Sequence, residues 1–292
     1  MYFSWLAAAP NATWFLSLDE RCYQLDDDEK LFFKRESGIQ DDEELRRDII
    51  SVQIKAFTVR TLAIARILPL KVLKNHRLKL GRLPAYTRLL KLGRERKDGI
   101  FVDIGCCFGN DVRKAVQDGF LVENTLATDL RRGHEMFKST PQTFPTLFVE
   151  GDILKLEFLM PVIPFTKENP PTTSDPSLNK ITSLNALRGH VSAIFTGAYF
   201  HPFNEEQQEL IARKLAGGIS SSKGTWGPTG HDYQMFCYSS QSWKELWEGI
   251  FGKGNIEVEA RVRKEVGGDS FFDMYPGNKD PYHVTEWSVT RV

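Results

Sequence analysis

Three acidic residues stand at the ends of three separate apolar stretches in the middle of the chain. Asp103 is followed by Gly105 and Gly109, and Asp129 and Asp152 come at the ends of two later apolar stretches. Carboxylates accept hydrogen bonds from hydroxyl, amino and ammonium groups, and a glycine turn lets a ligand lie against bare backbone. These residue types predict a binding site for a polar small molecule if the fold brings the three stretches side by side.

Parallel strands would position the acids in this way, and the pattern around Gly105 favours such strands. An apolar run at 100–104 stops at Gly105, and after Gly109 apolar residues recur every four positions, as in a helix. A second strand is predicted at 124–129, which completes a strand, helix and strand within about thirty residues, the βαβ unit of a parallel sheet. Two further buried strands are predicted at 146–149 and 191–195.

The rest of the chain extends this pattern into a predicted α/β fold. Helices are predicted at 85–93, 205–215 and 242–250, and strands at 256–262 and 283–292. Alternating strands and helices that end in two strands joined by a loop indicate a doubly wound, Rossmann-like sheet with an antiparallel edge. Residues 161–190 are rich in Pro, Ser, Thr and Asn and are predicted to form a surface insertion.

An N-terminal arm and helical extension, residues 1–98, is expected to precede a ligand-binding domain at residues 99–292. Asp41, with Glu44 three residues later, predicts the start of a long helix that ends before Pro69. One apolar stripe of this helix is predicted to contain Leu45, Ile49, Val52, Ala56, Val59 and Ala63. Residues 1–40 show no clear periodicity, so we expect an extended arm that packs on other parts of the protein.

The ligand expected at the strand ends is S-adenosyl-L-methionine rather than a dinucleotide. A dinucleotide site needs the spacing G-x-G-x-x-G, and this chain has Cys107 between Gly105 and Gly109. Asp129 can accept from both ribose hydroxyls, Asp152 from the adenine amino group and Asp103 from the methionine ammonium. Each acid alone is equally well explained as a cap or turn residue. Neighbouring residues expected to line the same site are Cys106, Leu130, Ile153, Thr196 and Gly197.

The stretch 103–113 reads Asp-Ile-Gly-Cys-Cys-Phe-Gly-Asn-Asp-Val-Arg and resembles the fungal class I methyltransferases of terpenoid and meroterpenoid biosynthesis. The resemblance continues in Gly133-His134, Gly151-Asp152, Phe200-His201 and Ser242-Trp243. It implies a seven-stranded sheet and transfer of a methyl group from S-adenosyl-L-methionine, with S-adenosyl-L-homocysteine as the product. It also implies a small lipophilic secondary metabolite as acceptor, in some members a carboxylic acid that becomes a methyl ester. The connection from Asp129 to Gly133 is shorter than the family pattern.

The chemical class of the methyl acceptor determines whether the reaction needs a general base. A carboxylate is already ionised at neutral pH, whereas a phenol or alcohol must lose a proton to a base. The candidate bases are His134, His201 and His231. His201, just past the fourth strand beside Tyr199, is the best placed, and we expect His201 and Tyr199 to be catalytic, although a buried histidine bonded to the backbone explains His201 equally well. Trp226, His231 and Phe203 are expected to contact the acceptor. Arg60, Arg66 and Arg77 are candidates to pair with an acceptor carboxylate.

The composition excludes few classes of protein. Net formal charge is zero and four cysteines, two of them adjacent, do not form a disulfide framework, so a cytoplasmic protein is expected. No apolar run is long enough to span a membrane, and Cys106 and Cys107 lack partners at metal-ligand spacing, so no metal is expected. The basic segment 71–97 leaves an RNA methyltransferase as an alternative, although a solvated face with no nucleic-acid partner is favoured. A cofactor-binding scaffold without catalysis is a third possibility.

Overall fold

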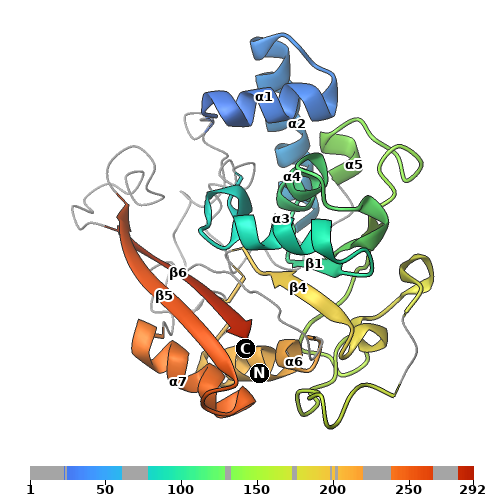
Figure 1. Ribbon diagram of the computed structural model, residues 1–292. Coiled ribbons are helices and arrows are strands. Elements are labelled where there is room, and N and C mark those ends of the chain that lie inside the picture. Colours follow the sequence, from blue (N-terminus) through green and yellow to red (C-terminus); the bar gives the residue numbers. More distant parts are fainter. Residues whose placement is uncertain are drawn as a thin grey trace. The chain divides into compact units, whose positions relative to one another are not determined.

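The structure, a computed structural model, describes residues 23, 25–60, 78–128, 133–172, 176–197, 199–200, 203–219, 238–265 and 282–292. The chain forms two compact units (Figure 1). The smaller contains the residues up to Arg77 together with Arg132–Thr143, and the larger contains Leu78–Arg131 and Phe144–Val292. The functional boundary expected after residue 98 stays a prediction.

A four-stranded parallel sheet lies at the centre of the larger unit. It contains β1 (Ile100–Ile104), β2 (Thr125–Thr128), β3 (Leu147–Phe148) and β4 (Val191–Phe195), in the order β3-β2-β1-β4. All three neighbouring pairs are parallel, which confirms the predicted α/β fold. An isolated parallel bridge from Val191 to Ile219 continues the pairing beyond β4.

Successive side chains along each strand lie on opposite faces of this sheet, and both faces are buried in hydrophobic clusters. Phe101, Ala127 and Phe195 belong to one hydrophobic cluster, which also contains residues of the first helices of the unit. Val102, Ile104, Leu126 and Ile194 belong to a second cluster together with residues of later helices. A strand that is buried on both faces reads as a continuous apolar run, and this is the pattern that made β1 and β4 predictable to the residue.

Helices cover each face of the sheet (Figure 1). α3 (Tyr86–Glu95) and α4 (Asn110–Gln117) contribute Leu89 and Val112 to the first cluster. α6 (Glu205–Ala216) and α7 (Ser240–Phe251) contribute Leu215 and Trp247 to the second. Short 3₁₀ helices complete the connections: η5 (Leu80–Arg82), η6 (Val122–Asn124), η7 (Leu178–Lys180) and η8 (Leu184–Leu187). No helix of the described ranges is long and apolar enough to cross a membrane.

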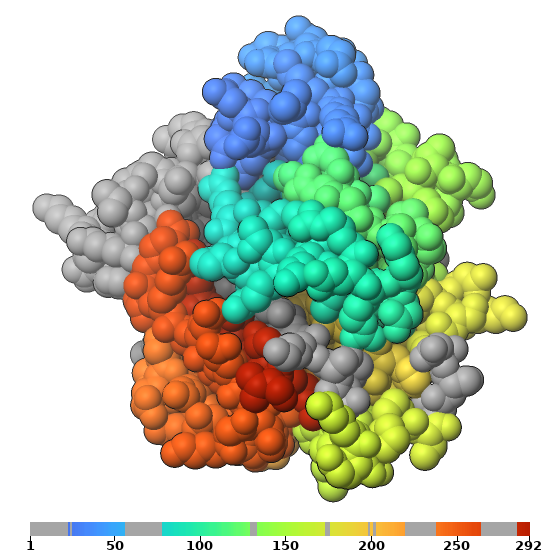
Figure 2. Space-filling view, viewed as in Figure 1, coloured from blue at the N-terminus to red at the C-terminus, as the bar shows by residue number. Residues whose placement is uncertain are grey.

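The chain ends in a separate two-stranded antiparallel sheet, β5 (Ile256–Glu265) and β6 (Tyr282–Arg291). Arg88 of α3 donates to Glu259 of β5 at 2.7 Å and to Ser288 of β6 at 2.8 Å. The space-filling view shows α3, in teal, next to β5, in orange (Figure 2). The described residues contain six strands in two sheets, so the seven-stranded count is not confirmed.

The smaller unit is helical. α2 (Asp42–Arg60) begins as predicted, since the Asp41 carboxylate accepts from the Glu44 N–H at 2.8 Å. Leu45, Ile49 and Val52 of the predicted stripe are buried. The expected end of this helix near Pro69 lies outside the described residues.

The expectation of an extended arm at 1–40 is wrong for its last part, which forms α1 (Asp27–Ser37). Asp26 and Glu29 make a reciprocal capping box, and Gly38 ends the helix in the left-handed conformation. The Phe33 ring stacks on Phe137, which follows the short helix α5 (Gly133–Met136) between β2 and β3.

Candidate functional site

The turn between β1 and α4 has an unusual backbone. φ is positive at Gly105 (71°), Cys107 (54°) and Gly109 (76°), so left-handed residues alternate with others. The N–H groups of Gly105 and Cys106 both donate to the carbonyl of Thr128, at 2.9 and 3.0 Å. The turn is thereby fixed to the end of β2, directly before the predicted ribose-binding Asp129.

Both glycines also make room for aromatic rings. A Cβ added to Gly105 would lie 2.3 Å from Cδ2 of Tyr199, and one added to Gly109 would lie 3.2 Å from Cε1 of Phe148. The glycines were predicted on the ground that a ligand needs bare backbone there. The left-handed φ and these ring contacts are additional reasons within the protein itself.

The first turn of α4 carries no side-chain cap, because its N-cap residue is Gly109. Uncapped N–H groups and the positive end of the helix dipole favour a negatively charged group of a ligand. Asp111, the acid of this first turn, is not a cap, because its carboxylate accepts from the backbone of the segment before α3.

The ends of β1 and β4 bring several predicted site residues together. Asp103 is 1% exposed and stands opposite Ala127 of β2 and Phe195 of β4. Thr196 is fully buried directly after β4, and Gly197 follows it. Strand order reverses between β1 and β4, and ligands of open α/β sheets bind beyond the strand ends at such a reversal.

Tyr199 and Phe203 follow β4 in the chain and place two aromatic rings against each other. The Tyr199 ring lies at Gly105, as described above, and tilts against Phe203 with 5.6 Å between ring centroids. Both side chains are half-buried and pack against the larger hydrophobic cluster. The two rings therefore form an aromatic surface next to the glycine turn, and Phe203 is one of the residues expected to contact the acceptor.

Asp152 and Ile153 lie in the turn that follows β3. The Asp152 side chain is exposed and one of its oxygens accepts from the Leu154 N–H at 2.9 Å, so the acid shapes its own turn. The Ile153 side chain is buried in the core. A Cβ on Gly151 would lie 2.0 Å from Cδ2 of Phe158, so this glycine of the family resemblance is needed for packing.

Lys214 supports this turn, and no sequence pattern singled it out. Its side chain is fully buried in α6, and the ammonium donates to the carbonyls of Ile153 at 2.8 Å and Lys155 at 3.2 Å. Burial lowers the pKa of Lys214, and the negative charges of Asp152 and Glu157 oppose that shift. A buried ammonium bonded to two carbonyls fixes the backbone that carries Asp152.

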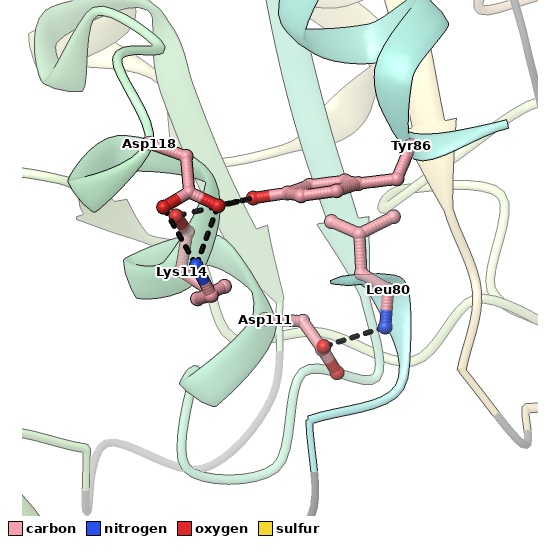
Figure 3. Close-up of polar contacts among 5 residues, drawn as sticks. All are labelled: Leu80, Tyr86, Asp111, Lys114 and Asp118. Carbon is pink, nitrogen blue, oxygen red and sulfur yellow. Dashed lines mark hydrogen bonds and ion pairs between the residues drawn. The ribbon is translucent and has the colours of Figure 1, made fainter. Parts of the chain in front are cut away.

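Two sets of polar contacts attach α3 and the segment before it to α4 (Figure 3). The Asp111 carboxylate accepts from the N–H groups of Lys79 at 2.9 Å and Leu80 at 2.7 Å. The Tyr86 hydroxyl donates to Asp118 at 2.6 Å, and Lys114 pairs with the same carboxylate at 2.6 Å. Burial, and then the Asp118 hydrogen bond, raise the pKa of Tyr86. The only feature of the sequence that pointed to these contacts was Asp111, an acid in the first turn of a predicted helix.

Five predicted site residues lie outside the described residues: Asp129, Leu130, His201, Trp226 and His231. Their assignments stay predictions, as do the candidate arginines Arg60, Arg66 and Arg77, whose side chains are likewise not described. Cys106 and Cys107 are partly buried and form no disulfide. Within the described ranges, no group of three or more His, Cys, Asp or Glu side chains is arranged to hold a metal ion.

Comparisons with known proteins find methyltransferases. No protein-family model matches the chain. The chain is 23% identical over 216 residues to "O-methyltransferase phiE" of a fungal species, a match that covers 66% of this chain and 63% of the relative. It is 24% identical over 170 residues to "Asnovolin E/Chermesin D methyltransferase nvfJ" of Aspergillus novofumigatus, covering 51% and 52%. The chain thus spans less than two thirds of the length of these relatives.

Among solved structures, an S-adenosylmethionine-dependent methyltransferase from Mesorhizobium loti aligns with 73% of this chain and 100% of its own, at 12% identity and a TM-score of 0.40.

Proposed function

We propose that this chain is an S-adenosylmethionine-dependent O-methyltransferase that acts on a small lipophilic secondary metabolite, with a carboxylic acid as the favoured acceptor. The observation that carries the proposal is the turn from Gly105 to Gly109, which follows a buried acid, is bonded to the end of β2 and opens onto an uncapped helix. Fungal relatives whose names include O-methyltransferase and methyltransferase support the same reaction class.

The described residues fit the methionine end of the cofactor. Asp103 offers a buried carboxylate for the ammonium. The turn with Gly105, Cys106 and Gly109 leads into α4, and the first turn of that helix, which has no side-chain cap, suits the carboxylate. Asp152 and Ile153 would hold the adenine, in a turn fixed by Lys214. We assign the ribose to Asp129 and Leu130, and place Thr196 and Gly197 beside the transferred methyl group.

The protein's work in this reaction is positioning. S-adenosyl-L-methionine supplies a methyl group on a sulfonium, and an acceptor oxygen bonds to that carbon as the carbon–sulfur bond breaks and its electron pair stays on sulfur. The reacting atoms must be aligned and water excluded, which buried residues at the ends of β1 and β4 and the rings of Tyr199 and Phe203 are suited to do.

Binding of the product tests the proposal directly. Calorimetric titration should show S-adenosyl-L-homocysteine binding to the wild-type chain, weakened at least about tenfold in Asp129→Ala, since a carboxylate hydrogen-bonded to two hydroxyls is lost. Asp98→Ala, at an exposed acid paired with Arg96, is the matched control and should bind as the wild type does. Absence of binding to the wild type, or equal affinities in all three, would refute the proposal.

The acceptor class is tested with His201. Mass spectrometry with a panel of terpenoid and aromatic acids and phenols should detect the gain of one methylene unit on an acid. His201→Ala should retain substantial activity if the acceptor is a carboxylate, because no proton has to be removed. A loss of several orders of magnitude with normal cofactor affinity would favour the hydroxyl or phenol acceptor, with His201 as base and Tyr199 beside it.

A further inference from the structure

Lys79 lies beside the end of β4. Its Cδ is 3.5 Å from the point that a Cβ on Gly197 would occupy, and Gly197 is the second residue after β4. The side chain is half-buried, and its Cδ lies against the backbone at this strand end. The Cδ of Lys79 thus lies at the end of β4, beside the position where strand order reverses between β1 and β4, and the ammonium is one methylene group beyond it.

The backbone of Lys79 is fixed by a buried acid. Asp111 is 8% exposed, and its carboxylate accepts from the N–H groups of both Lys79 and Leu80 (Figure 3 shows the bond to Leu80). These two bonds attach the segment to the first turn of α4, directly after the glycine turn. Asp111 is thus occupied by the backbone, and no acidic side chain of the described ranges forms an ion pair with the ammonium of Lys79.

The order of the strands indicates which part of a bound complex lies near Lys79. In the proposed function, Asp152 after β3 and Asp129 after β2 hold the nucleoside, and the turn after β1 holds the methionine end. β4 lies on the other side of β1 from these strands. The end of β4 is therefore the acceptor side of the site, and a lysine there favours an acceptor that carries a negative charge.

We propose that Lys79 binds a carboxylate beyond the end of β4, and that the carboxylate belongs to the methyl acceptor. This inference rests on the proposed function. An ammonium that holds one carboxylate oxygen keeps the acceptor ionised and leaves the second oxygen to attack the methyl carbon. Tyr199 and Phe203, which follow the same strand, supply apolar surface for the body of a lipophilic acid. The methionine carboxylate of the cofactor is the other source of the same chemistry.

Two pairs of ligands separate these sources. Farnesoate and farnesol differ in the carboxylate of a lipophilic acceptor, and S-adenosyl-L-homocysteine and 5′-methylthioadenosine differ in the amino-acid end of the cofactor. All four are titrated by calorimetry into the wild type, Lys79→Met, Lys79→Arg and Lys91→Met. Methionine keeps the apolar stem and the backbone bonds to Asp111, so the fold is retained, and Lys91, an exposed lysine paired with Glu95, is the matched control.

We expect Lys79→Met to bind farnesoate about tenfold more weakly than the wild type while farnesol and both nucleosides bind unchanged. Lys79→Arg should restore most of the farnesoate affinity. If the substitution weakens only the binding of S-adenosyl-L-homocysteine, Lys79 binds the carboxylate of the cofactor and not that of the acceptor. If all four ligands bind Lys79→Met as they bind the wild type, or if farnesol and 5′-methylthioadenosine lose as much affinity as the acids, the assignment is wrong. Failure of the proposed function would look different, because the wild type itself would then bind neither nucleoside.

Discussion

Cys107 adopts a backbone conformation that L-residues avoid. Its φ of 54° places it in the left-handed region, between two glycines that share this sign. A non-glycine residue there costs about 1–2 kcal/mol in steric strain. The strain lies within the turn to which we assign the methionine end of the cofactor, and strained backbone is often retained at binding sites.

Replacing Cys107 with glycine should therefore stabilise the protein. We expect Cys107→Gly to raise the free energy of unfolding by about 1 kcal/mol in urea titrations, with S-adenosyl-L-homocysteine affinity unchanged. Cys106→Gly is the control, because φ at Cys106 is not positive and glycine there only adds freedom to the unfolded chain, so stability should fall. Equal effects of the two substitutions would contradict the role assigned to backbone strain.

At the scale of elements, Lys214 connects α6 to the turn after β3. Its two bonds to carbonyls lie inside the core, and removing them leaves the Ile153 carbonyl without its donor. Lys214→Met should lower the free energy of unfolding by about 1–3 kcal/mol and speed amide hydrogen exchange in residues 153–157. Arg213→Met, at the exposed neighbouring residue paired with Glu209, should change neither.

The adenosine affinity of Lys214→Met shows whether Lys214 supports the proposed adenine site or only the stability of the fold. Asp152 is proposed to hold the adenine, so adenosine affinity should fall in Lys214→Met at a temperature where the variant is fully folded. Unchanged adenosine binding with altered hydrogen exchange would show that the turn does not hold the adenine.

α3 and the two-stranded sheet are joined by a pH-dependent contact. Hydrogen bonds from Arg88 and then Ser288 lower the pKa of Glu259, so the folded state holds this carboxylate ionised more strongly than the unfolded chain does. The stabilisation is present above the unfolded pKa of about 4.3 and is lost as pH falls through the lower folded value. Both side chains are partly exposed, so its size is at most about 1 kcal/mol.

The expected result is a stability difference that depends on pH. Glu259→Gln should be less stable than the wild type at about pH 7, and the two should converge as pH falls toward about 3. Urea midpoints measured across this range test it, with Glu257→Gln on the same strand as control. A difference that persists unchanged into the acid range would mean that ionisation of Glu259 does not stabilise the contact.

Across the whole molecule, local patterns predicted the sheet better than they predicted the contacts between distant segments. β1 and β4 were predictable because strands buried on both faces are continuous apolar runs. α1 was not predicted, because its buried residues include adjacent Phe32 and Phe33 and the acid Glu29, which do not follow a simple helical stripe. The capping box of Asp26 and Glu29 was the signal available in the sequence.

The buried residues that support the candidate site, Asp111 and Lys214, could not be predicted from the sequence in the same way. Asp111 contacts residues 31 and 32 positions away, and Lys214 contacts carbonyls 61 and 59 positions away. A charged residue on a predicted helix is most often solvated, so its type and spacing do not distinguish a buried anchor from an exposed face. Gly105 shows a related difficulty, since the sequence revealed the glycine but not the Tyr199 ring against it.

Part of the connection from β2 to β3, Arg132–Thr143, belongs to the smaller unit together with the N-terminal helices. Phe33 of α1 is fully buried and stacks on Phe137, with 5.3 Å between the ring centroids. Lys55 and Asp48 of α2 pair with Glu135 and Lys138 of the same connection. Glu135, Phe137 and Lys138 of this connection thus contact α1 and α2, and the connection follows Asp129 and Leu130 closely in the chain.

Phe33→Ala tests this dependence. Truncating a fully buried ring should destabilise the smaller unit by about 3–5 kcal/mol, so hydrogen exchange should speed up in both 27–37 and 133–143. Because Asp129 and Leu130 lead directly into that segment, S-adenosyl-L-homocysteine should bind more weakly, whereas Leu31→Ala, at an exposed residue of the same helix, should leave both measurements unchanged. If exchange at 133–143 stays slow in Phe33→Ala, α1 does not hold the connection. If exchange rises and affinity does not change, the connection is held by α1 but the proposed ribose site does not depend on it.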